Sequence, residues 1–141
     1  MREVPLTRKV FQRLAELRAS EAAILVRNRN DQGAYYLAGY AVECALKACI
    51  AKQTKRHEFP PNREFVGQVY SHKLEKLLEL AELKQELDKD MRTRPALAAN
   101  WGVVKSWTQN SRYEISGLKG RDLHTAITSS DGVLPWIKQR W

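Results

Sequence analysis

The sequence predicts an all-α fold, an up-and-down bundle of four long helices followed by short C-terminal helical segments. Two observations lead to this prediction. Apolar residues recur with the 3.6-residue period of an α-helix through most of the chain. No segment shows the sustained apolar–polar alternation that a half-buried strand requires. Because the 141 residues contain no repeat and no linker, we expect residues 1 to 141 to form a single domain.

The first predicted helix covers residues 7 to 26 and is amphipathic. Val10 and Leu14 lie on the same side of it, together with further apolar residues at helical spacing. Thr7 is the predicted N-cap, because its hydroxyl can accept a hydrogen bond from a free backbone N–H of the first turn. Residues 27 to 33 are rich in Asn, end in Gly and predict a turn.

Residues 34 to 52 are the most apolar part of the chain and predict a central helix that is buried on most sides. Glu43 is the exception, since a buried carboxylate is costly unless it is paired. Lys47 follows at i+4, the favourable order for an ion pair, so we expect a structural polar pair. Two alternatives stay open: a polar network of Glu43 with Tyr36 or Tyr40, and a functional polar spot at a cleft or dimer seam.

The remaining elements follow from turn residues and helix-start signals. In chain order, they are a loop over residues 53 to 70, a helix capped by Ser71 that continues to residue 91, a helix over 95 to 109 that begins with Pro95, a break over 116 to 120, a short helix over 121 to 129 and a terminal turn opened by Pro135. A loop as long as the first of these is uncommon and often functional.

The net charge of the chain is +8, from 24 Lys and Arg against 16 Asp and Glu. Residues 71 to 91 contain four basic and six acidic residues, so the positive surplus lies in the two flanking parts of the chain. Such a surplus favours a polyanionic partner, and it is also compatible with solvated helix ends that serve solubility.

Several enzyme and location classes lack their usual signals. Cys44 and Cys49 are five residues apart, which places them on different sides of a helix and predicts two reduced core residues. The three histidines are scattered, and the motifs of zinc proteases, serine hydrolases, NTPases and dinucleotide enzymes are absent, so we expect no metal and no cofactor. The longest apolar run is nine residues and the start is charged, so we expect a cytoplasmic protein without a membrane partner.

A short segment near the C-terminus combines the residues that phosphate chemistry needs. Gly117 and Gly120 precede a predicted helix, whose first N–H groups and dipole favour an anion. Lys119 and Arg121 add positive charge as a phosphate clamp, and His124 is the candidate acid or base for attack by a ribose 2′-hydroxyl. An ordinary helix start is the competing interpretation. The predicted nucleic-acid-binding residues are Arg112, Tyr113, Lys119 and Arg121.

The segments AGYAVECALKACIAK and HKLEKLLELAEL, the Arg112-Tyr113 pair and the ending GVLPWIKQRW resemble the HEPN superfamily (higher eukaryotes and prokaryotes nucleotide-binding). The resemblance implies a helical bundle that usually dimerises. Many members are metal-independent RNases of toxin–antitoxin, phage-defence or CRISPR systems, and others pair with a minimal nucleotidyltransferase.

RNase members of that superfamily carry an Arg, four to six further residues and then a His. At those spacings before His124 stand Gly117, Leu118 and Lys119, of which only Lys119 is basic. The resemblance therefore implies a homodimer that binds RNA or nucleotide in a toxin–antitoxin or phage-defence module and leaves ribonuclease activity open. The alternative is a non-catalytic interaction module that pairs with a nucleotidyltransferase, an antitoxin or another protein.

Overall fold

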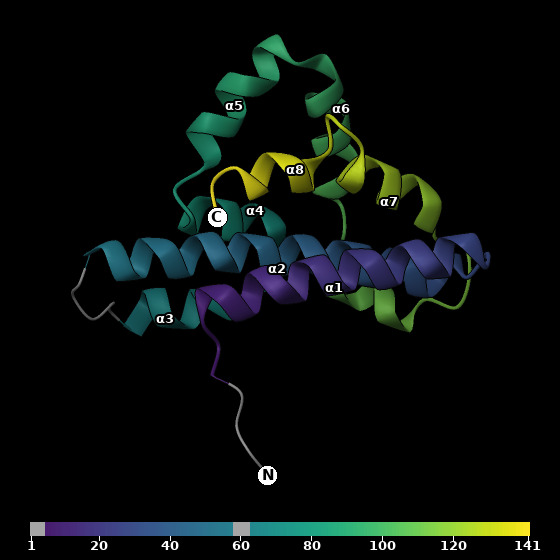
Figure 1. The fold of residues 1–141 in the computed structure, drawn as a ribbon, viewed down its shortest axis with the longest axis horizontal. Coiled ribbons are helices and arrows are strands. Elements are labelled where there is room, and N and C mark those ends of the chain that lie inside the picture. Colours follow the sequence, from purple (N-terminus) through teal and green to yellow (C-terminus); the bar gives the residue numbers. More distant parts are fainter. Residues whose placement is uncertain (1–4, 58–62) are drawn as a thin grey trace.

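Two long antiparallel helices, α1 and α2, form the base on which the other helices pack (Figure 1). The structure is a computed structural model that describes residues 5 to 57 and 63 to 141. All regular elements in these ranges are helical, which confirms the predicted all-α bundle. Figure 1 shows α5, α6 and α8 on one side of the α1–α2 pair and α3 on the other.

Helix α1 (Arg8–Arg27) begins and ends with side-chain caps. The predicted N-cap is confirmed, because the Thr7 hydroxyl accepts a hydrogen bond from the Val10 N–H at 3.2 Å. At the other end, the Asn28 amide donates to the Ile24 carbonyl at 2.9 Å. The turn that follows is shorter than predicted, because helix α2 already begins at Asp31.

Helix α2 (Asp31–His57) is the central helix and is buried continuously from residue 41 to residue 46. It extends beyond the predicted end at residue 52, because the sequence up to His57 contains no helix breaker. The predicted loop over 53 to 70 is therefore wrong at both ends, since helix α3 (Arg63–Val69) occupies its second half. The middle of that loop, residues 58 to 62, lies outside the described residues.

The predicted helix over 71 to 91 is two helices, α4 (Leu74–Leu80) and α5 (Lys84–Thr93). The break has a packing cause: Ala81 and Leu83 are both buried, and residues two apart face opposite sides of a straight helix. The predicted cap at Ser71 is also wrong, because the N-cap position is Lys73. Instead, the Ser71 hydroxyl accepts a hydrogen bond from the Lys73 N–H at 3.1 Å.

The C-terminal third consists of short helices. Helix α6 (Pro95–Val104) begins with Pro95 as predicted but ends five residues earlier than residue 109. A 3-10 helix, η1 (Gln109–Tyr113), follows, and then α7 (Gly120–Thr128) and α8 (Val133–Lys138). The predicted terminal turn is thus a helix, anchored by a 2.8 Å hydrogen bond from the buried Trp136 indole to Asp90. Within the described ranges, no helix is long and apolar enough to cross a membrane.

Two glycines allow a direct test of how tightly α2 is packed. A Cβ atom on Gly39 would lie 2.2 Å from ring atoms of the buried Trp107, whereas nothing lies within 4 Å of a Cβ on the exposed Gly102 of α6. We expect Gly39→Ala to lower the free energy of unfolding by about 2 kcal/mol through overpacking. The matched control, Gly102→Ala, should raise it by about 0.5 to 1 kcal/mol. Urea unfolding measures both, and equal effects would contradict the tight packing of Trp107 on α2.

Candidate nucleic-acid interface

One glutamine side chain fixes the loop that precedes α7. The Gln32 amide group donates a hydrogen bond to the Glu114 carbonyl at 3.2 Å and its oxygen accepts one from the Leu118 N–H at 2.9 Å. Both ends of the loop over residues 114 to 118, here called the clamped loop, are thereby tied to the first turn of α2. Gly117 in this loop has a φ of 87°, a left-handed conformation that favours glycine.

The first residue of α7 lies directly against the first residue of α2. A Cβ atom on Gly120 would be 2.3 Å from the Asp31 carbonyl oxygen, so only glycine permits this approach. The contact places Lys119 and Arg121, both exposed, at the end of the molecule where α1 turns into α2. Arg29 belongs to that turn, two residues before Asp31, so a further cation lies at the same end.

The exposed pair Arg112 and Tyr113 lies at the other side of the clamped loop. The guanidinium carbon of Arg112 is 4.8 Å from the centroid of the Tyr113 ring, a cation–π distance. Hydrogen bonding to Tyr113 raises the pKa of Arg112, and hydrogen bonding to Tyr36 adds to that rise. The Tyr113 side chain nevertheless remains 69% exposed. The structure thus brings the four predicted nucleic-acid-binding residues to the two sides of one fixed loop.

Two aromatic rings of α2 and one ring just before η1 form a stack where η1 packs on α2. Tyr36 lies between Tyr40 and Trp107, with ring centroids 6.2 Å apart in both pairs. Burial is the largest cause that raises the pKa of Tyr40 to about 12, so its hydroxyl stays protonated near neutral pH. Below the surface, the Trp107 indole nitrogen and the Ser111 hydroxyl are buried without a hydrogen-bond partner in the described part of the chain.

His124 faces helix α1 rather than the clamped loop. Burial lowers its pKa below the ordinary value of 6.5, and a hydrogen bond to the backbone of Ala19 opposes part of that shift. The imidazole is therefore neutral at pH 7. Arg121 precedes His124 by three residues, so the two are neighbours on the surface of α7. Lys119 stands before the helix at its N-cap position.

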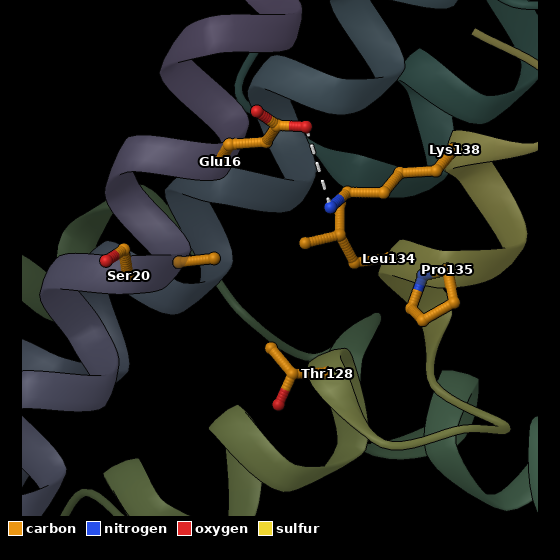
Figure 2. Close-up of a pocket in the computed structure, with 7 residues that line it drawn as sticks. Glu16, Ser20, Thr128, Leu134, Pro135 and Lys138 are labelled. Carbon is orange, nitrogen blue, oxygen red and sulfur yellow. Dashed lines mark ion pairs between the residues drawn. The ribbon is translucent and has the colours of Figure 1, made fainter.

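An open pocket of about 390 Å³ lies one helical turn beyond His124, between α1, α7 and α8 (Figure 2). Ser20 and Glu16 contribute to it from α1, and Thr128 contributes from α7. The Thr128 hydroxyl donates a hydrogen bond to the backbone carbonyl of His124 at 2.8 Å. The Glu16 carboxylate lies 3.8 Å from the Lys138 ammonium group, so the charges in the pocket pair with each other.

A second polar cluster surrounds Glu43 in the middle of α2. The Glu43 side chain is 3% exposed, and one of its oxygens lies 3.2 Å from the Lys47 ammonium group. Both of its oxygens also contact the His72 Nδ1 atom, at 3.0 and 3.1 Å. Glu43 thus makes these polar contacts with Lys47 and His72, whereas the rings of Tyr36 and Tyr40 stack on each other. Sequence reasoning missed His72, although a buried acid with a single nearby cation was the signal to search for a second partner.

The cysteines offer little chemistry. Both are buried on α2, and burial is the main cause that raises the pKa of Cys44 and of Cys49 to about 11. Each thiol is therefore protonated and weakly reactive at neutral pH. Within the described residues, no group of three or more His, Cys, Asp or Glu side chains is arranged to hold a metal ion.

Comparison of the chain with protein-family models, with curated proteins and with solved structures finds no significant match in any of the three. The HEPN resemblance consequently rests on the sequence motifs and stays a prediction. Function must therefore be inferred from the geometry of the clamped loop and of α7.

The Glu43 cluster predicts a characteristic mutational pattern. We expect Lys47→Met to lower the free energy of unfolding by about 2 to 3 kcal/mol, because it leaves a buried carboxylate with one partner fewer. The double variant Glu43→Leu with Lys47→Met should lose less than the single variant, because it removes the buried charge as well. Urea unfolding of the single and double variants measures the difference. An equal or greater loss in the double variant contradicts the assigned ion pair.

Proposed function

We propose that this chain binds RNA or a nucleotide through the α7 basic surface, defined here as Arg112, Tyr113, Lys119 and Arg121. The main observation in support is the pair of Gln32 hydrogen bonds, which fix the loop between the two halves of this surface. All four side chains are exposed, and among the described residues none of the three cations forms an ion pair. Unpaired cations on a fixed scaffold are suited to phosphate.

The local charge favours a small number of phosphate contacts. Residues 112 to 124 hold three cations and two carboxylates, Glu114 and Asp122. The surplus over this stretch is one positive charge, and Arg29 at the adjoining turn adds to it. The start of α7 contributes free N–H groups and the positive end of the helix dipole. We infer that the ligand is a short strand or a nucleotide rather than a long duplex tract.

The HEPN resemblance supplies the biological setting of the proposal. In that setting, the chain acts as a homodimer in a prokaryotic toxin–antitoxin or phage-defence module. A ribonuclease version of the proposal assigns the acid or base role to His124 and the phosphate clamp to Lys119 and Arg121. The position of His124 next to Arg121 on α7 and its neutral state at pH 7 favour this version.

A protein-binding module is the second candidate function. Apolar side chains stand unusually exposed on α1, where Leu17 is 42% and Ile24 is 48% exposed. In the clamped loop, Ile115 is 92% exposed. Such side chains favour contact with a partner protein, such as a nucleotidyltransferase or an antitoxin. The binding experiment that follows tests the first candidate, because affinity that comes from phosphate contacts falls as salt rises.

The RNA-binding proposal predicts a salt-dependent affinity that depends on α7. We expect the double variant Lys119→Ala with Arg121→Ala to bind a short single-stranded RNA more weakly. The slope of log affinity against log salt should shrink by about 0.7 for each phosphate group that the variant no longer neutralises. The matched control, Lys84→Ala with Lys89→Ala, removes the same charge from exposed positions on α5 and should leave the slope unchanged. Fluorescence anisotropy at several salt concentrations measures both, and a flat salt dependence of the wild type contradicts the proposal.

The ribonuclease version predicts cleavage in EDTA that is lost in His124→Ala. Only the neutral imidazole can accept the 2′-hydroxyl proton, so the rate should rise with pH and then level off. Because burial lowers the pKa of His124, the rate should reach half of its plateau value below pH 6.5, the ordinary pKa of histidine. Denaturing gels of labelled RNA across pH measure the profile. Equal cleavage by both proteins, or none by either, rules out His124 catalysis and leaves the binding function standing.

A further inference from the structure

Tyr113 is exposed, and one side chain contacts its ring. One face of its ring lies against the Arg112 guanidinium group at 4.8 Å. Tyr36, which stacks on Trp107, contributes to the raised pKa of Arg112, after the larger contribution of Tyr113. A side chain that is 69% exposed ordinarily samples several rotamers, and the contact with Arg112 restricts that freedom. The result is an aromatic surface that is presented to solvent in advance of any binding.

The short helix that carries this ring packs on a tightly filled part of α2. Trp107 is 2% exposed and fills the notch above Gly39, where any Cβ atom would collide with its ring. Tyr36 stacks on Trp107 with an interplanar angle of 25°. The short helix η1 that carries Arg112 and Tyr113 is therefore seated on α2, and its next residue enters the clamped loop. The backbone that carries Tyr113 is thereby fixed by packing, and Arg112 is the side chain in contact with its exposed ring.

The charge balance leaves room for a contribution that is not electrostatic. Three cations against two carboxylates in residues 112 to 124 supply only a few phosphate contacts. Stacking of a base on an aromatic side chain contributes an attraction that does not depend on that surplus. Every base offers a π-face, but in a duplex the bases are already stacked on one another and are not available.

We propose that Tyr113, held by Arg112, is a base-stacking platform that makes the α7 basic surface selective for an unpaired RNA strand over a duplex. The inference rests on the proposed RNA-binding function and adds the class of ligand. Lys119 and Arg121, on the other side of the clamped loop, hold the phosphates that flank the stacked base. Tyr113 supplies affinity through its ring and the two cations supply it through charge, so their effects on salt dependence differ.

The test compares Tyr113→Ala with Tyr113→Phe, which keeps the ring. The matched control is Tyr70→Ala, because Tyr70 is similarly exposed, at 66%, and follows α3 rather than η1. The probes are a short oligoadenylate, the same strand with abasic positions, and an RNA duplex of equal length. We expect Tyr113→Ala to weaken oligoadenylate binding about tenfold without changing the salt slope. Tyr113→Phe should lose much less affinity than Tyr113→Ala because it keeps the ring, Tyr70→Ala should bind as the wild type does, and the wild type should prefer oligoadenylate to the duplex.

Three results would contradict the base-stacking role of Tyr113. The first is unchanged oligoadenylate binding by Tyr113→Ala, which leaves the proposed RNA-binding function intact if the wild type still shows salt-dependent affinity. The second is an equal loss on the abasic strand, which shows that Tyr113 acts by ordering the loop. The third is equal affinity of the wild type for oligoadenylate and duplex. If the wild type binds none of the probes, the proposed function fails together with the inference. Circular dichroism of each variant confirms that the comparison is between folded proteins.

Discussion

The burial of α2 on nearly every side is the constraint on which the rest of the structure depends. A helix that is apolar over most of its circumference is stable only when other elements remove it from water, at about 25 cal/mol per Å² of apolar surface covered. Here α1, α4, α7, α8 and η1 all pack against it. Small side chains on α2 permit the close approach, and the ring of Trp107 against Gly39 is the tightest example.

The same constraint explains the polar features of the molecule. Inside the apolar length of α2, Glu43 needs polar partners, and Lys47 supplies a cation while His72 supplies a ring nitrogen within hydrogen-bond distance. His72 comes from the segment before α4, so the cluster also fixes where that helix begins on α2. At its first turn α2 is only half-buried, and there Gln32 and the Asp31 backbone are available to hold the clamped loop and α7. The candidate interface thus forms where the burial of α2 ends.

Local patterns predicted the elements whose causes are local. The Thr7 cap, the Pro95 helix start and the glycine break before α7 depend on neighbouring residues, and each is present. The break between α4 and α5 was missed because it depends on the burial of both Ala81 and Leu83, which only the tertiary fold determines.

The candidate site likewise combines residues that a local pattern predicts with residues that only the tertiary fold brings together. Lys119, Arg121 and His124 were found from their spacing around Gly120, a signal contained in one short segment. The residue that joins this segment to Arg112 and Tyr113 is Gln32, which lies 82 and 86 positions away from its two hydrogen-bond partners. No sequence pattern identifies a half-exposed glutamine at the start of a helix as the residue that holds a distant loop. The orientation of His124 toward the Ala19 backbone likewise follows from how α7 packs on α1.

Binding and cleavage place different demands on this site, and the structure meets them to different degrees. Stacking and phosphate contacts need exposed groups on a fixed scaffold, which the α7 basic surface provides within one chain. Cleavage needs a base and an acid on opposite sides of the phosphate, together with cations for its developing charge. His124 supplies one such group and lies half-buried against α1. A second acid or base would have to come from an element other than α7, so cleavage requires one more catalytic group than binding does.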